Sequence, residues 1–306
     1  MLPRFLFYIM SATILLFSGC STGIEKTKTI SLSKNDKKEL APSQEEIFIE
    51  PLKAELLCDW SVGKSFLVSD ERASVVFDAI GVQSNLEGKI VKYSGVEKKT
   101  TPDGTDEAVI IFSDGTESLR YSTGKRVEDA VGKISSMDIP MLIDLDLVDK
   151  AGKLLSGKTL WTRSQLWYDR LGNKISGRKF VPVTVEAVLP GNMIFPLRVN
   201  IRDENGDEAM LYMNLKNSGV ESRTFSTLFN LKDQKLSYPS ILPEVWSLIQ
   251  DGKVKLGMTK EECKLSLGNP GDVNSGHDWN STIDLWQYPN GAYLRFQDGL
   301  LVDFRN

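Results

Sequence analysis

The chain has 306 residues, 41% of them hydrophobic and 25% charged, which is an ordinary composition for a globular protein of two or three domains. Its formal net charge of −4 argues against nucleic acid as a partner, because a nucleic-acid-binding surface needs a surplus of basic side chains. A zinc site built from Cys and His needs four ligands close together, but the three cysteines and the one histidine are spread along the chain and form no such cluster. We therefore expect no metal and no cofactor. The sequence singles out no catalytic residue, so we expect no enzymatic activity.

The N-terminus, Met1 to Cys20, has the parts of a secretory signal. Arg4 supplies a positive charge, residues 5–17 form an apolar run, and two small residues precede Cys20. This arrangement resembles the signal of bacterial lipoproteins, which implies a signal peptide over residues 1–19 and lipid attachment, palmitate included, at Cys20. Several acyl chains on one residue anchor a protein stably, so the lipid bilayer is the first expected partner. An ordinary secretory signal or an N-terminal anchor helix is the alternative.

Residues 20–46 carry the lipidated cysteine and then a segment rich in Lys, Ser, Thr and Glu. This composition predicts a flexible tether with a reach of roughly 25–30 Å. Ser21 follows the lipidated position, and no aspartate is there to retain the protein at the inner membrane. The resemblance to lipoproteins therefore implies the outer membrane. We expect the periplasmic face, because no acidic run of the kind linked to surface export follows.

The middle of the chain contains a weak internal repeat, in residues 47–136 and 137–236. Gly63-Lys64 in the first copy corresponds to Gly157-Lys158 in the second, and the hairpin signals at Gly115 and Gly206 have nearly the same offset. Period-two alternation and Asp-Gly or Asn-Gly turns predict short strands in both copies. We expect two small, mostly β units, each an SH3-like barrel, joined by a segment that holds a helix from Pro140 onward.

Residues 152–159 match the phosphate-binding pattern GxxxxGK[ST]. The mechanism requires a helix that begins at Lys158, whereas the following residues are typical of a strand. We therefore expect a turn before a strand rather than a nucleotide site. Trp161, Trp167 and Tyr168 follow it, and they form either a glycan-binding platform or part of a core. A cell-wall lipoprotein that binds peptidoglycan or another glycan through these residues is the alternative function.

Residues 237–306 carry the most specific pattern. Pro243 is expected at the first position of a short helix, with Ser240 as its cap. A second helix is expected after Thr259, because Glu262 three residues later has the spacing of a capping box.

A polar loop is expected through Asn280, followed by three strands, the last two joined by Asp298-Gly299. Two helices on one face of a small antiparallel sheet is the simplest packing, which predicts an ααβββ module. We expect Cys58 and Cys263 to be buried free thiols rather than a disulfide, since each has apolar neighbours.

Five runs in this module carry a family resemblance: Gly257-Met258-Thr259, Glu262-Cys263, Leu267-Gly268-Asn269-Pro270, Trp286-Gln287-Tyr288 and Leu294-Arg295-Phe296-Gln297-Asp298-Gly299. They resemble the SmpA/OmlA family, which contains the small lipoprotein subunit of the outer-membrane β-barrel assembly machinery. The resemblance implies the ααβββ fold and a protein-binding, non-catalytic role. Two features depart from it: the module is the last quarter of a longer chain, and Cys263 stands where valine is expected.

The complete expectation is an α+β protein with two mostly-β repeats and a C-terminal ααβββ module. We expect a membrane-anchored, periplasm-facing lipoprotein that serves as a protein-binding or scaffold component in outer-membrane assembly or maintenance. Its partner would be another envelope protein. The expected contact residues are the aromatic side chains of the last strands: Trp286, Tyr288, Tyr293 and Phe296.

Overall fold

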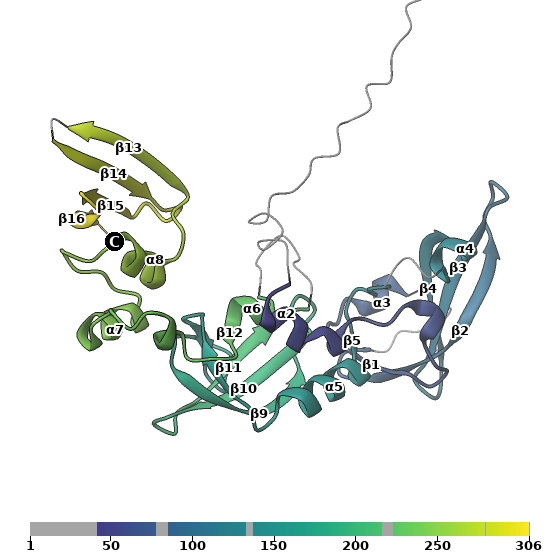
Figure 1. Ribbon diagram of the computed structural model, residues 1–306. Helices are drawn as coiled ribbons and strands as arrows, with labels where there is room; N and C mark the ends of the chain where they lie inside the picture. Colours follow the sequence, from purple (N-terminus) through teal and green to yellow (C-terminus); the bar gives the residue numbers. More distant parts are fainter. Residues whose placement is uncertain (1–41, 78–84, 133–136, 216–222, 279, 306) are drawn as a thin grey trace, which may run out of the picture. The chain divides into compact units, whose positions relative to one another are not determined.

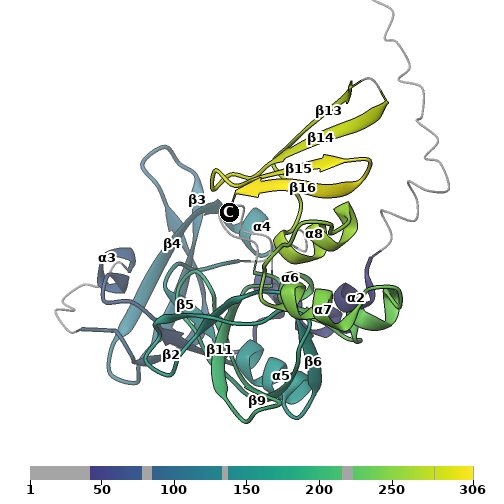
Figure 2. The same cartoon turned by 90° about the vertical axis from the view of Figure 1, so that its left-hand side faces the viewer.

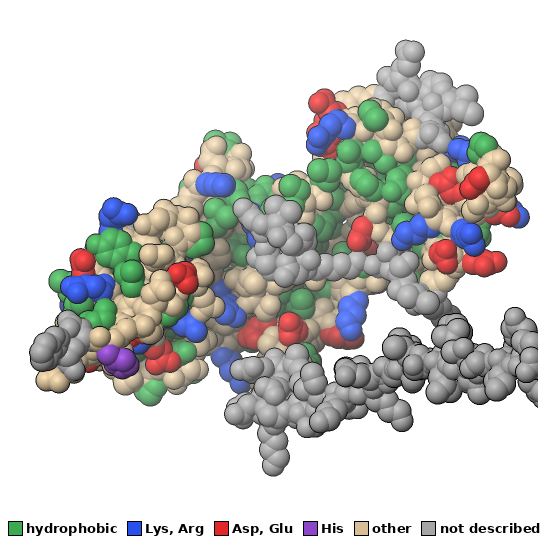
Figure 3. Space-filling model, turned by 90° about the horizontal axis from the view of Figure 1, so that it is seen from above, with side chains coloured by type: hydrophobic (Ala, Val, Ile, Leu, Met, Phe, Trp, Pro, Cys, Tyr) green, Lys and Arg blue, Asp and Glu red, His purple; other side chains and the backbone are tan. Residues whose placement is uncertain are grey.

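The computed structural model describes residues 42–77, 85–132, 137–215, 223–278 and 280–305. These residues form an α+β protein that consists mostly of strands, in curled antiparallel sheets (Figure 1). The predicted signal peptide, the lipidation site Cys20 and the tether as far as residue 41 lie outside the described residues. Among the described residues, no helix is both long enough and apolar enough to cross a membrane. Side chains of both charge signs are interspersed on the face shown in Figure 3, where His277 is exposed.

The first sheet is a meander of four strands in chain order, and a fifth strand pairs with the first of them at one edge. Its order is β4-β3-β2-β1-β5, with β1 (Ser65–Val68), β2 (Ile90–Thr100), β3 (Asp106–Ser113), β4 (Ser118–Arg126) and β5 (Leu142–Asp144). The expected boundary after residue 136 assigns residues 142–144 to the second unit, whereas the structure pairs them with β1.

Short helical segments accompany the first sheet, and its core is rich in aromatic side chains. The segments are η2 (Leu57–Asp59), α3 (Ala73–Val76) and α4 (Val127–Ala130), whereas η1 (Glu50–Leu52) buries Leu52 in the core of the second sheet. The ring of buried Phe112 lies 5.5 Å from that of Phe66 and 6.0 Å from that of Phe77, measured between centroids in edge-on pairs. Such pairs add to the stabilisation that burial of apolar surface provides.

The second sheet has the order β12-β6-β9-β10-β11-β7-β8. Its strands are β6 (Thr159–Thr162), β7 (Leu166–Tyr168), β8 (Lys174–Ser176), β9 (Pro182–Pro190), β10 (Leu197–Asp203), β11 (Glu208–Met213) and β12 (Phe229–Asn230). Helix α5 (Leu145–Leu155) buries one apolar face in the core of this sheet, with Val148, Ala151 and Leu155 inside. The helix begins later than the expected Pro140, because Asp144 caps it by accepting from the N–H groups of Asp146 and Leu147.

Helix α2 (Gln44–Phe48) packs on the same core. Phe48 lies 5.4 Å from Phe225 of helix α6 (Phe225–Leu228), measured between ring centroids. Residues 44–46 were expected to belong to the tether, and this expectation is wrong: Ser43 and Glu46 form a capping box, which starts a helix there.

The two sheets share a strand order and a hydrogen-bonded turn. The neighbours β1-β2-β3-β4 correspond to β6-β9-β10-β11. Gly63 and Gly157 precede the first strand of each set at φ of 93° and 76°, a conformation that costs a residue with a Cβ atom about 1 kcal/mol or more. The N–H of Gly63 donates 2.8 Å to the carbonyl of Tyr93 in the neighbouring strand, and the N–H of Tyr93 donates back to the carbonyl of Lys64. In the second sheet, the N–H of Gly157 donates 2.8 Å to the carbonyl of Val185, and the N–H of Val185 donates back to the carbonyl of Lys158.

The C-terminal module has two helices on one side of a four-stranded sheet (Figure 2). The chain enters it through η3 (Gln234–Ser237), and its elements are α7 (Pro243–Gln250), α8 (Lys260–Leu267), β13 (Asp272–Asp278), β14 (Ser281–Gln287), β15 (Tyr293–Gln297) and β16 (Leu300–Arg305). The expected capping box of Thr259 and Glu262 is confirmed. The expected hairpin turn is confirmed as well, with Asp298 and Gly299 at φ of 50° and 84°.

Two details of the expected module are wrong. The polar loop through Asn280 contains an edge strand, β13, so the sheet has four strands rather than three. This strand was missed because its one apolar residue, Val273, gives no alternation, and pairing with β14 rather than composition determines it. Ser240 does not cap α7, whose N-cap residue is Leu242 without a side-chain hydrogen bond.

Residues 178–180, which lie between β8 and β9 of the second sheet, pack against the module. Phe180 is 7% exposed and belongs to the core of the module, where its ring lies 5.9 Å from that of Trp246. The guanidinium of Arg178 donates 2.9 Å to Gln250 Oε1, and the N–H of Lys179 donates 2.9 Å to the Gln250 carbonyl. Phe180 has φ of 53°, which strains a bulky residue by about 1–3 kcal/mol, so its neighbours must hold it in place.

The Lys64 side chain contacts three carboxylates from two segments of the chain: Glu55 before β1, and Asp144 and Asp146 at the start of α5. Its side chain is 2% exposed, and Nζ lies 2.9 Å from Asp144, 3.1 Å from Glu55 and 3.2 Å from Asp146. Burial disfavours the ammonium, but hydrogen bonds and charge attraction from Asp144 and Glu55 outweigh it and raise the pKa of Lys64. A hydrogen bond from Lys150, with the help of Lys64, lowers the pKa of Glu55 against the opposing effect of burial.

We expect Lys64→Met to lower the free energy of unfolding by about 1–3 kcal/mol at pH 7, because Asp144 and Asp146 lose the lysine that they share and Glu55 keeps only Lys150. A carboxyl group with a lowered folded-state pKa stabilises the fold above its unfolded pKa, and this contribution is lost as the pH falls through the folded value. The difference between wild type and variant should therefore narrow between about pH 5 and pH 3. Urea unfolding followed by tryptophan fluorescence measures it.

The matched control for this variant is Lys153→Met. Lys153 is 76% exposed and pairs with Asp149 one helical turn away, so its removal should cost no more than about 0.5 kcal/mol. A Lys64→Met difference that stays constant with pH would show that lost packing, rather than the charges, causes the destabilisation.

Two glycines give a second prediction, in which one alanine substitution lowers the stability of the protein and the other raises it. A Cβ atom at Gly177 would lie 2.2 Å from the ring of buried Trp167, so Gly177→Ala should destabilise the protein by about 1–3 kcal/mol. A Cβ atom at Gly152 inside α5 meets nothing within 4 Å, so Gly152→Ala should stabilise it by up to about 1 kcal/mol. Thermal unfolding of both variants checks this, and equal shifts would contradict the packing of Trp167 on Gly177.

Candidate functional site

The strands of the C-terminal module have one buried face and one exposed face. In β15 the buried Leu294 and Phe296 alternate with half-buried Tyr293 and exposed Arg295. The buried side chains join the core beneath α7 and α8. Period-two alternation therefore places Tyr293 on the face opposite to the helices.

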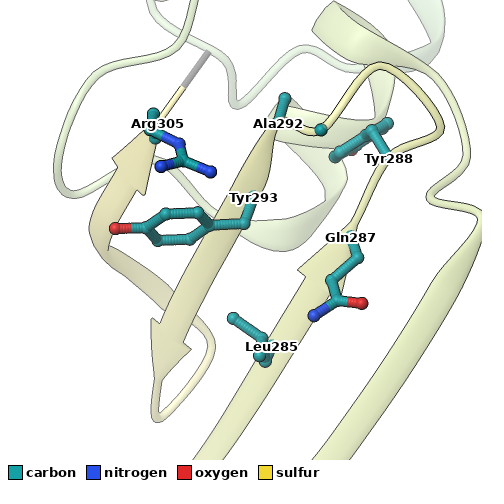
Figure 4. Close-up of a pocket in the computed structure, with 7 residues that line it drawn as sticks. Leu285, Gln287, Tyr288, Ala292, Tyr293 and Arg305 are labelled. Atoms are coloured by element: carbon teal, nitrogen blue, oxygen red, sulfur yellow. The ribbon is translucent and has the colours of Figure 1, made fainter.

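A concavity of about 450 Å³ lies on this exposed face. Cross-strand pairing brings Gln287 of β14, Tyr293 of β15 and Arg305 of β16 into one row. Figure 4 shows these three side chains with Leu285 beside them. The complete lining consists of Leu285, Gln287, Tyr288, Gly291, Ala292, Tyr293 and Arg305.

Two contacts position the ring of Tyr293. The guanidinium carbon of Arg305 lies 5.5 Å from the centroid of the ring, within the range of a cation–π contact worth about 0.5–1 kcal/mol at an exposed site. The hydroxyl of Tyr293 donates 3.2 Å to Asp303 Oδ2. An aromatic ring is thus held in the open beside a positive charge, ready to contact a partner without first being ordered.

Tyr288 closes one end of the concavity. Its hydroxyl donates 3.2 Å to the carbonyl of Gly268 at the end of α8. Burial, followed by the effect of Cys263, raises the pKa of Tyr288 to about 12, so the phenol stays neutral and keeps this hydrogen bond.

The four predicted contact residues therefore separate into two groups. Tyr288 and Tyr293 line the concavity, whereas Trp286 and Phe296 are 8% and 0% exposed and pack together in the core, 4.7 Å apart between ring centroids. Leu285, Gln287 and Arg305 also line the concavity and were not among the predicted residues. The pairing register across β14, β15 and β16 would have found them, because residues directly opposite in neighbouring strands share a face.

The three residues expected to form a glycan platform do not share an exposed surface. Trp167 is 6% exposed and donates through Nε1 to the carbonyl of Ser164, and Tyr168 is 8% exposed and accepts from Arg223. Trp161 alone of the three is half-buried. The core interpretation therefore fits Trp167 and Tyr168, since a stacking platform requires exposed ring faces.

The two cysteines of the described chain are free thiols in different settings. Cys263 is buried, and burial with a smaller effect of Glu262 raises the pKa of its thiol to about 12, which keeps it protonated and unreactive. Cys58 was expected to be buried, but it is exposed. Within the described ranges, no group of three or more His, Cys, Asp or Glu side chains is arranged to hold a metal ion.

Comparison of the chain with protein-family models, curated proteins and solved structures gave no match. The resemblance to the SmpA/OmlA family and the lipoprotein signal therefore stay predictions from the sequence.

The division between surface and core gives a prediction. Phe296→Ala should lower the free energy of unfolding by about 3–5 kcal/mol, because it leaves a cavity in the core of the module. Tyr293→Ser should lower it by no more than about 1 kcal/mol, since it removes an exposed ring with one hydrogen bond. Urea unfolding of both variants checks this. A loss for Tyr293→Ser as large as that for Phe296→Ala would make Tyr293 a structural residue.

Proposed function

We propose that this protein is a lipid-anchored lipoprotein on the periplasmic face of the outer membrane. It binds another envelope protein as a scaffold component in outer-membrane assembly or maintenance. The observation that carries this proposal is the exposed concavity around Tyr293, in which aromatic, apolar and cationic side chains meet on an open sheet face. Tyrosine and arginine are the side chains that most often supply binding energy at protein interfaces.

The concavity suits a particular kind of contact. Its volume of about 450 Å³ accepts one or two large apolar side chains of a partner against Leu285 and the Tyr293 ring. Arg305 and Gln287 lie beside them and offer donors to a carboxylate or a backbone carbonyl of the partner. An apolar centre with polar groups around it is the usual anatomy of a protein interface.

The anchor and the location rest on the sequence. Cys20 carries the lipid in this proposal, and the tether that follows lets the folded part contact proteins away from the bilayer surface. The absence of enzymatic activity belongs to the same proposal, because it follows from the family resemblance and from a sequence that singles out no catalytic residue.

We propose in addition that the two β sheets are duplicated units of the SH3-like kind. Two observations support duplication. The four-strand order is the same in both sheets, and the paired hydrogen bonds around Gly63 and Tyr93 recur around Gly157 and Val185. Chance rarely repeats a positive-φ glycine together with both of its hydrogen bonds at equivalent strand positions.

In-cell photocrosslinking tests the binding function. A benzophenone amino acid at Tyr293 should give a discrete adduct with one outer-membrane protein, identified by mass spectrometry. The matched control is the same amino acid at Leu171, which is 87% exposed and outside the concavity. Identical products from both positions, or no adduct from Tyr293, would contradict the proposal.

Two further arms separate the alternatives. Cys20→Ala should move the chain out of the membrane fraction and remove the adduct, and a variant that stays membrane-bound would contradict the lipid anchor.

The crosslinker at Trp161 tests glycan binding. Material trapped on peptidoglycan from Trp161, with no protein adduct from Tyr293, would favour the cell-wall function.

A further inference from the structure

A second cavity, of about 350 Å³, lies outside the C-terminal module. Its walls come from the segment before β1, from the chain around β5, and from the second sheet near the turn between β9 and β10. Most of the lining side chains are apolar, and Met137, Met141 and Met193 are among them. Methionine is flexible and polarisable, and surfaces rich in it adapt to apolar partners of different shape.

The turn between β9 and β10 displays apolar side chains where polar ones are usual. Met193 and Ile194 line the cavity and are 42% and 55% exposed. The side-chain oxygen of Asn192 accepts from the N–H groups of Ile194 at 3.0 Å and Phe195 at 2.9 Å, which fixes the turn. Two large apolar side chains are thus held partly in water at the edge of a cavity, an arrangement that marks an interaction site.

A strained residue lies in the opposite wall. Met141 has φ of 66°, which is uncommon for a residue other than glycine, asparagine or aspartate. Its carbonyl accepts from the N–H of Ser69 at 2.8 Å and from the hydroxyl of Ser69 at 3.0 Å, which holds the strained backbone. Strain of this kind is concentrated at ligand-binding positions, so Met141 supports the interpretation of the cavity as a binding site.

The charges of the lining select the ligand. Among the described residues that line the cavity, Glu55, Asp138 and Asp144 are carboxylates and none is lysine or arginine. Lys64 lies close by, but its ammonium has three donors and already contacts three carboxylates. Lys150, outside the lining, pairs with Glu55 as well. Among the described residues, Glu55, Asp138, Asp144 and Asp146 still outnumber these two lysines, so a fatty acid or a phospholipid headgroup would meet surplus negative charge. A ligand with basic groups beside an apolar part meets complementary charge instead.

We propose that this cavity is a docking site for a segment of a partner protein in which an apolar side chain is flanked by lysine or arginine. The apolar side chain enters between Met137, Met141 and the turn at Met193 and Ile194. The basic groups contact Glu55 and Asp144 at the edge. This site shares no residue with the concavity around Tyr293, so the chain presents two docking surfaces, and each proposal stands or fails by itself.

Three fluorescent heptapeptides test the proposal against the full chain in phosphatidylcholine nanodiscs, with fluorescence anisotropy as the measurement. The first is Lys-Lys-Leu-Phe-Leu-Lys-Lys, the second replaces every lysine by glutamate, and the third replaces the apolar centre by three serines. We expect the first to bind at least about tenfold more tightly than either of the others, with an affinity that falls as salt rises.

Variants locate the binding. The double substitution Met193→Ser and Ile194→Ser should weaken the first peptide by at least about tenfold, and it changes only exposed side chains of a turn. Leu171→Ser, which changes a more exposed apolar residue of another turn, should leave the affinity unchanged. The proposal is overturned by any of three results: no binding of the first peptide, equal binding of all three peptides, or an unchanged affinity in the double variant.

Discussion

A pair of hydrogen bonds around one positive-φ glycine organises each of the two large sheets. The glycine lets the chain turn into the first strand, and the reciprocal bonds with the second strand set the pairing register. The other strands of the meander add outward from that pair, and β5 or β12 pairs with the opposite edge of the first strand. The lysine after the glycine differs between the two sheets: Lys64 is buried among three carboxylates, whereas Lys158 is exposed. The same backbone hydrogen-bond pattern therefore occurs with a buried lysine in one sheet and an exposed lysine in the other.

The C-terminal module depends on a different constraint, the short segment from Gly177 to Phe180. Gly177 lies against the ring of Trp167 in the second sheet, while Phe180 fills a place in the core of the module. Lys179, between them, has its pKa lowered by burial and donates from Nζ to the Ser266 carbonyl near the end of α8, where the helix dipole favours a cation. A few residues thus belong to two cores, and a strained φ at Phe180 is retained because both sides hold it.

Local signals in the sequence predicted local structure well. The capping box at Thr259, the turn at Asp298 and the strand after Lys158 were correct because each depends on a few neighbouring residues. Other features depend on contacts between different segments, which local sequence patterns do not reveal. They are the pairing of β5 with β1, the polar strand β13 and the Lys64 cluster. The site was half predicted for the same reason. Aromatic content identified the strands, and alternation along β15 separates Tyr293 on the surface from Phe296 in the core. The pairing register is what adds Gln287 and Arg305 to the site.

The two proposed docking surfaces have a physical consequence beyond their separate affinities. Once a partner is held at the concavity near Tyr293, a second segment of that partner, or of a protein bound to it, meets the methionine-lined cavity at an effective concentration that reaches the millimolar range for short flexible connections. Weak contacts at each surface then suffice for stable assembly, because the second association no longer loses the full translational freedom of a free molecule. The charges make the two surfaces unlike: Arg305 beside one favours a carboxylate, and Glu55 and Asp144 beside the other favour a cation. A partner segment that fits one surface is therefore disfavoured at the other, so each surface selects a different kind of segment.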